Sequence, residues 1–166
     1  MKKLSVISIV ALVAIFGTQA AFAQASATQT VSLAVNAVYK IATSGSPAPL
    51  VITEGTAGSD NLTSVSDNST TYSITQNVGN TLKITAHMDA ALPSGYTLNI
   101  NLASTKGTSL GNVNISNATA GSAVDVVTGI ARGADAAQTI GYTFAATASA
   151  GTLTSTTKTI TLTLTN

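Results

Sequence analysis

The chain has 166 residues, of which only 8% are charged and none is cysteine or tryptophan. Basic and acidic residues nearly balance and aromatic rings are few, so the chain lacks both a basic patch that neutralises phosphates and rings that stack on bases. We therefore expect no nucleic-acid partner. Without disulfides, the fold must be stabilised by sheet packing or by a neighbouring molecule.

The first 23 residues have the pattern of a secretory signal. Two lysines precede an apolar run over residues 4–17, which is short for a membrane span, and residues 21–23 (Ala-Phe-Ala) supply the small residues that signal peptidase accepts. The alternative is a retained membrane anchor, but polar Thr18 and Gln19 interrupt the run. Cleavage leaves residues 24–166, with five basic against six acidic residues, a net charge of −1 and no membrane segment.

Residues 28–42 alternate in polarity over about twice the length of a typical strand. The odd-numbered side chains are apolar and the even-numbered ones mostly polar, which places one row on a buried face. The segment is either an ordinary first strand within its own sheet or an overhanging strand that is added to the sheet of a neighbour. In the second case Val31, Leu33 and Val35 enter a groove of the neighbour, and Ala37 is a small residue where strands approach closely.

The rest of the chain alternates in shorter units that are separated by turn residues. Eight or nine short strands of this kind predict an all-β protein, an Ig-like antiparallel β-sandwich, with a closed barrel as the second choice. Residues 131–138 could hold one helical turn at most. The expected strands after the first cover residues 50–54, 70–76, 82–88, 96–102, 112–116, 123–130, 140–146 and 159–165.

Several short motifs look chemical without the context that their chemistry needs. Residues 107–111 match G-x-S-x-G, but the only histidine, His87, precedes them and no helix is expected to follow. A lone histidine without cysteine partners is a poor zinc site, and the Asp-Asn pairs at residues 60–61 and 67–68 fit turns better than a calcium loop. We therefore expect no enzyme activity, and no catalytic, cofactor-binding or metal-binding residues.

The layout resembles that of cysteine-free fimbrial subunits of the chaperone–usher type. The resemblance is carried by the signal sequence, the alternating stretch at residues 30–38 (TVSLAVNAV), the Ig-like run of strands and the final strand at residues 159–164 (TITLTL). Many such subunits have a disulfide and an aromatic residue next to last, where this chain has no cysteine and Thr165. The resemblance favours a filament subunit more strongly than a particular secretion pathway.

The resemblance implies an incomplete sandwich over residues 38–166 whose groove is filled by residues 24–37 of the next copy. The partners that it implies are further copies in a filament, together with a periplasmic chaperone and an outer-membrane usher. The expected location is the cell surface or the extracellular space, reached through the periplasm. The alternative from a different class is a monomeric Ig-like surface module that binds a glycan or a host protein.

Overall fold

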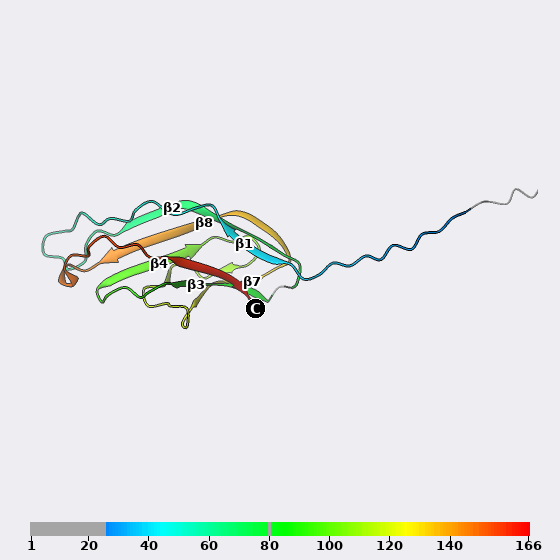
Figure 1. Cartoon of the computed structure of the whole chain (residues 1–166). Coiled ribbons are helices and arrows are strands. Elements are labelled where there is room, and N and C mark those ends of the chain that lie inside the picture. The colour runs from blue at the N-terminus through cyan, green and yellow to red at the C-terminus, as the bar shows by residue number, and fades with distance from the viewer. Residues whose placement is uncertain (1–25, 80) are drawn as a thin grey trace, which may run out of the picture. The chain divides into compact units, whose positions relative to one another are not determined.

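The computed structural model describes residues 26–79 and 81–166 (Figure 1). The signal sequence predicted for residues 1–23 lies outside the described residues. The chain divides into residues 1–34 and a compact unit, Val35–Asn166, which contains every strand that is described.

The compact unit consists of two antiparallel sheets, which confirms the predicted all-β sandwich. Every strand pair within the sheets is antiparallel. In spatial order, the first sheet contains β1 (Tyr39–Thr43), β2 (Val65–Gln76), β8 (Gly133–Ala146), β4 (Tyr96–Leu102) and β6 (Val113–Asn114). The second sheet contains β5 (Thr108–Ser109), β7 (Val124–Ile130), β3 (Leu82–Met88) and β9 (Ile160–Thr165).

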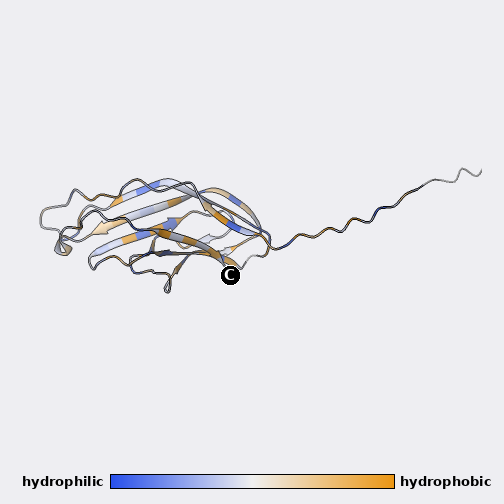
Figure 2. Cartoon of the chain, in the orientation of Figure 1, coloured by the Kyte–Doolittle hydropathy of each residue, from blue (hydrophilic) through white to orange (hydrophobic). Residues whose placement is uncertain are grey.

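The core is built by side chains that alternate along the strands (Figure 2). Every second residue of β3 and β4 is buried while the residues between are partly exposed, as a period of two requires in a sheet with one buried face. Ile84 on β3 and Ile100 on β4 are fully buried, and Val126 and Val127 of β7 join the same apolar cluster. The interior is therefore a layer of aliphatic side chains between the two sheets.

The strands run lengthwise between two ends of the compact unit (Figure 1). The proximal end is the end at which β1 begins, where Tyr39 pairs with Gln76 and Gln76 with Gly133. The distal end is the opposite one, where Tyr96 pairs with Ala146. These two names are used for the ends below.

The largest differences between predicted and observed elements lie in three regions. The strand expected over residues 28–42 is confined to Tyr39–Thr43, and residues 50–54 form no strand. Residues 131–138 hold no helical turn, since most of them belong to β8. There β8 carries an extra residue opposite β2, and Ala137 adopts a positive φ of 52°, so this bulge interrupts the alternation that marks a strand in the sequence.

Asp135, at this bulge, fixes the loop that follows β4. Its carboxylate accepts hydrogen bonds from the Thr105 amide (2.8 Å) and hydroxyl (2.6 Å), the Ser104 hydroxyl (2.9 Å) and the Lys106 amide (3.1 Å). Burial acts to raise the pKa of Asp135, but these hydrogen bonds outweigh it and hold the pKa below its ordinary value. The loop is therefore tied to β8 by one ionised, 2% exposed side chain.

Candidate functional site

The two long edges of the sandwich are built differently. At one edge the chain passes directly from β5 in the second sheet to β6 in the first, so that short strands close both sheets. At the other edge, β1 and β9 have a strand neighbour on one side only among the described residues. Here the sandwich is open between two unpaired strand edges.

A groove of about 1140 Å³ occupies this open edge and is called the edge groove below. One bank is formed by residues 41–52, which comprise the end of β1 and the segment after it, and the other by residues 151–162, which lead into β9. The floor is the inner face of β8 and β4, with Leu98, Ile140, Tyr142 and Phe144. The volume exceeds the range of about 300–1,000 Å³ that is usual for small-molecule pockets.

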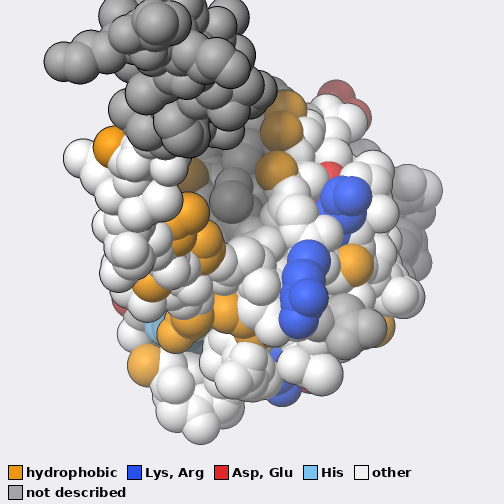
Figure 3. Space-filling view, turned by 90° about the vertical axis from the view of Figure 1, so that its right-hand side faces the viewer, with side chains coloured by type: hydrophobic (Ala, Val, Ile, Leu, Met, Phe, Trp, Pro, Cys, Tyr) orange, Lys and Arg blue, Asp and Glu red, His pale blue; other side chains and the backbone are white. Residues whose placement is uncertain are grey.

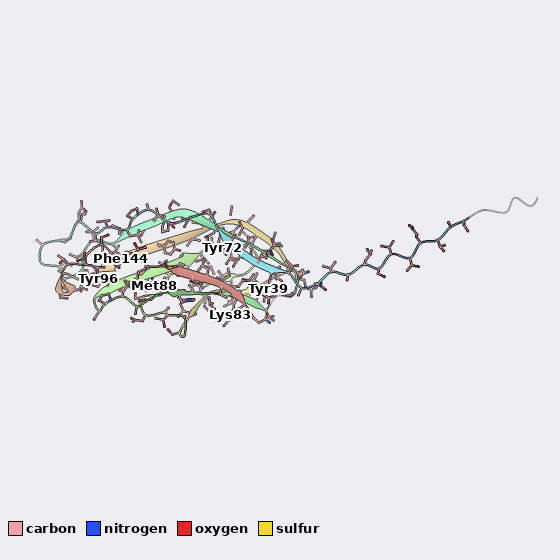
Figure 4. All side chains as sticks on the ribbon, viewed as in Figure 1. Tyr39, Tyr72, Lys83, Met88, Tyr96 and Phe144 are labelled. Atoms are coloured by element: carbon pink, nitrogen blue, oxygen red, sulfur yellow. The ribbon has the colours of Figure 1, made fainter. Side chains whose placement is uncertain are left out.

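The floor of the edge groove is apolar and neutral. The rings of Tyr96 and Phe144 stack with their centroids 6.4 Å apart and lie together toward the distal end (Figure 4). Burial raises the pKa of Tyr142, so its phenol stays protonated at neutral pH. Lys158 is the only charged residue in the lining, among the residues that the structure describes.

Both banks carry backbone groups that have no backbone partner. Within the described residues, neither residues 45–53 nor residues 152–157 make a hydrogen bond to another backbone group. The side chains Val51 and Leu153 on these banks are 62% and 36% exposed. Unpaired N–H and C=O groups beside an apolar floor form a template that an additional strand can pair with.

The distal end of the groove is closed by contacts between the chain before β2 and the turn after β8. The Asp60 carboxylate accepts hydrogen bonds from the amide (2.8 Å) and the hydroxyl (3.0 Å) of Ser149, and the Leu62 amide donates to the Ala146 carbonyl (3.0 Å). The Thr147 amide donates to the carbonyl of Gly95 (3.0 Å). The chain before β2, the turn before β4 and the turn after β8 are thus joined at this end.

Gly95 in this closure has no room for a side chain. Its φ is +87°, and a Cβ atom would lie 2.4 Å from Ala150 Cβ and 3.0 Å from Thr147 Oγ1. We expect Gly95→Ala to lower the free energy of unfolding by about 2–3 kcal/mol, from backbone strain and overlap together. Gly111 is the matched control, since its φ is +73° but a Cβ would meet nothing within 4 Å. Gly111→Ala should cost only about 1 kcal/mol; equal losses in chemical denaturation would contradict the packing described here.

At the proximal end, Asn77 holds the chain just before β1. Its side-chain oxygen accepts a hydrogen bond from the Val38 amide (2.7 Å), and its side-chain nitrogen donates to the Asn36 carbonyl (2.9 Å). Its backbone amide donates to the Val38 carbonyl (2.9 Å). Asn77 therefore fixes residues 36–38, directly before β1.

The side chains predicted to enter a neighbour's groove are exposed and lie in no helix or strand. Val31, Leu33 and Val35 are 69%, 89% and 88% exposed, and Ala37 is exposed as well. A row of three large, exposed apolar side chains at alternate positions is unusual for a folded chain. Their predicted role as donor residues stays a prediction.

The residues of the short motifs that look chemical lie in strands and turns, where Ser109 and Asp67 form hydrogen bonds with nearby residues. Ser109 of the G-x-S-x-G match donates to Asn101 Oδ1 (3.3 Å), whereas His87 lies on β3, which β7 separates from β5. Asp67 Oδ1 accepts hydrogen bonds from the hydroxyl (2.8 Å) and the amide (3.1 Å) of Ser69, and these bonds lower its pKa. Within the described residues there is no group of three or more metal-ligating side chains.

The banks of the groove and Asn77 were not identified from the sequence. The sequence predicts a strand over residues 50–54 and no element for the threonine-rich residues 152–157. The available signal was the pair of prolines, Pro47 and Pro49, which remove backbone donors beside residues 50–54. An asparagine directly after a strand was the corresponding signal for Asn77.

Comparison with known proteins does not identify a relative. The sequence matches no protein-family model, and a search of curated proteins finds no match. Among the described residues, no helix has the length and apolar character needed to cross a membrane.

Proposed function

We propose that this chain is a structural subunit of an extracellular fibre, a pilus or a surface matrix, in which residues 28–37 of one copy occupy the edge groove of the next. The observation that carries the proposal is the open edge itself. An apolar floor, flanked by two banks with unpaired backbone groups, occurs in a chain that also contains an exposed, alternating apolar segment.

The unpaired edge of β9 supports strand addition. Natural sheets protect exposed edges with lysine, proline, bulges or very short strands. The six residues of β9 (ITLTLT) include no charge and no proline, and their register with β3 is regular. An incoming strand could therefore pair with the backbone of β9 without meeting a bulge, a proline or a charged side chain.

The apolar row and the floor of the groove fit each other in chemistry and in length. Burying a valine or leucine side chain stabilises a complex by about 1.5–3 kcal/mol, and Val31, Leu33 and Val35 are almost fully available for burial. As a strand at about 3.3 Å per residue, residues 28–37 span about 33 Å, and a fully extended bank at residues 151–162 spans about 40 Å. The segment is long enough to line most of the bank.

Donor and acceptor surfaces differ but belong to the same chain. An interface between two different surfaces of one molecule is heterologous, and it generates open filaments unless the rotation closes a ring. Repeated donation therefore leads to a fibre. We place this fibre outside the cell, after cleavage of the predicted signal, and we propose a periplasmic chaperone and an outer-membrane usher as assembly partners.

A charged residue in the apolar row tests the proposal. We expect Leu33→Asp to slow fibre formation of the purified protein at least 100-fold, because an ionised carboxylate would have to be buried on the apolar floor. Ser32→Asp is the matched control, since it places the same charge on the neighbouring residue, in the row that faces away from the floor. Electron microscopy and size-exclusion chromatography measure both variants.

Equal assembly of the two variants would show that the apolar row does not enter a groove. A stable monomer of the unmodified protein, with no fibres at any concentration, would instead favour the self-contained surface module that binds a glycan or a host protein. The thermal unfolding of each variant confirms that the sandwich itself is intact.

A further inference from the structure

The charged side chains of the described residues are sorted between the two ends of the sandwich. Five basic and six acidic residues occur in the described chain. The strand registers and the loop contacts beside them place four of the five basic residues in the proximal half and four of the six acidic residues in the distal half. The basic residues of the proximal half are Lys40, Lys83, Lys106 and Arg132, and the acidic residues of the distal half are Glu54, Asp60, Asp67 and Asp89.

The proximal end presents positive side-chain charge to solvent. Lys106 packs beside Gly133, next to Arg132 in the turn before β8, with its Nζ 3.7 Å from where a Cβ of Gly133 would lie. Figure 3, which looks at the compact unit from its proximal side, shows Lys and Arg side chains gathered on this face. The acidic residues of this half add little exposed negative charge, because Asp135 is 2% exposed and Asp125 pairs with Lys83 at 2.9 Å. The exposed basic side chains of this half are therefore Lys40, Lys106 and Arg132.

The distal end presents negative side-chain charge. Asp60 lies in the closure of the groove, and Asp89 directly follows β3. Glu54 precedes this closure, and its carbonyl accepts a hydrogen bond from the Thr63 amide (2.9 Å). The basic residue in this half is Lys158, whose Nζ donates to the Ala91 carbonyl (3.3 Å).

We propose that the basic proximal end of one copy contacts the acidic distal end of the next copy in the fibre, and that this contact sets the direction in which the donor segment enters. The inference rests on the proposed function. Only Val38 separates residue 37 from β1, so the proximal end of a donor copy must lie close to one end of the acceptor's groove. If residue 37 lies at the acceptor's distal end, opposite charges meet; if it lies at the proximal end, two basic ends meet.

Charge complementarity therefore favours a donor segment that runs antiparallel to β9, because β9 runs from the distal to the proximal end. Complementary charges accelerate association and suppress wrong arrangements, and the effect weakens as salt screens it. Apolar contacts on the groove floor respond much less to salt. The contribution of the charged ends to the assembly rate can therefore be measured separately from that of the apolar contacts.

The test is a pair of charge reversals followed by light scattering of the purified protein at 50 mM and 500 mM NaCl. We expect Glu54→Lys with Asp89→Lys to slow assembly about tenfold at low salt, and Lys106→Glu with Arg132→Glu to do the same. A mixture of the two double variants, or the quadruple variant in a single chain, should recover the rate, since each restores opposite charges at the contact. At 500 mM NaCl the differences should shrink to less than about threefold.

Binding of a synthetic peptide with the sequence of residues 26–37 distinguishes this inference from the proposed function. The peptide lacks the sandwich with its charged ends and contains no charged side chain, so its affinity for the groove should be the same in every charge variant. If the charge variants assemble at a rate within twofold of that of the unmodified protein at 50 mM NaCl and bind the peptide normally, the proposed contact between ends is wrong. Strand donation would then remain supported. Slow assembly that the mixture does not rescue also overturns the contact. Failure of the Leu33→Asp variant, whose groove is not filled by another copy, to bind the peptide would overturn the proposed function.

Discussion

A synthetic peptide with the sequence of residues 26–37 is expected to raise the unfolding temperature of the Leu33→Asp variant by about 10 °C. The variant cannot donate its own segment but retains the complete edge groove, with Tyr142 and Phe144 on its floor. A ligand that binds only the folded state at 100 times its Kd stabilises that state by about 2.7 kcal/mol. For a domain of this size, each kcal/mol corresponds to a shift of about 3–5 °C.

Two control peptides make the result specific. The same peptide with Leu33→Asp should leave the unfolding temperature unchanged, and one with Ser32→Asp should act almost like the original, because residue 32 belongs to the polar row. A stabilisation that does not distinguish these peptides would indicate non-specific binding to the exposed apolar surface. Differential scanning calorimetry or circular dichroism measures the shift.

The second large effect is expected at Asp135, in the first half of β8. Replacing Asp135 by alanine removes the acceptor of four hydrogen bonds from residues 104–106, two of which come from backbone amides. We expect Asp135→Ala to lower the free energy of unfolding by about 3 kcal/mol. Hydrogen bonds to a charged group stabilise the fold more than neutral ones do, and the two backbone amides are left without an acceptor. Asp135→Asn retains one acceptor oxygen and should lose less. Urea denaturation at pH 7 measures both variants.

The acid stability of the protein should depend on the same side chain. The pKa of Asp135 is lowered in the folded state, so its ionised form contributes stability above the pKa of the unfolded chain, about 3.9, and this contribution is lost as the pH falls through the folded value. The difference in stability between the unmodified protein and Asp135→Asn should therefore shrink below about pH 4. A difference that stays constant from pH 7 to pH 3 would show that the charge of Asp135 is not what ties the loop to β8.

Two strands that pair on both sides, β3 and β4, could be predicted from the sequence with their limits. For β3 and β4, local alternation and tertiary burial agree, and the predicted and observed bounds coincide at Leu82–Met88 and Tyr96–Leu102. The first half of β8 could not be predicted, because the bulge beside Ala137 shifts the alternating pattern by one residue. Periodicity therefore predicts a strand only where its register is uninterrupted.

The candidate site shows a different limit of sequence reasoning. The run Leu50-Val51-Ile52 has the composition of a strand, but a strand also needs a neighbour to pair with, and this run lies on the bank of the edge groove. Which strand a sheet lacks is a property of the whole topology, so no local pattern reveals it. The apolar row at Val31, Leu33 and Val35 was visible in the sequence, whereas the surface that could receive it required the structure.

The central claim, that the edge groove holds residues 28–37 of a second copy, is tested most directly by cross-linking between distinguishable copies. A photoreactive diazirine amino acid at position 33 of a ¹⁵N-labelled chain is assembled with an equal amount of unlabelled chain, and mass spectrometry identifies the cross-linked peptides. We expect cross-links from position 33 to the floor or banks of the groove, residues 41–52, 96–98, 140–146 and 151–162, in pairs that combine both isotopes. Cross-links only within one isotope would mean that the segment folds into its own groove, and cross-links outside these residues would mean that the groove is not its site; either result contradicts the account.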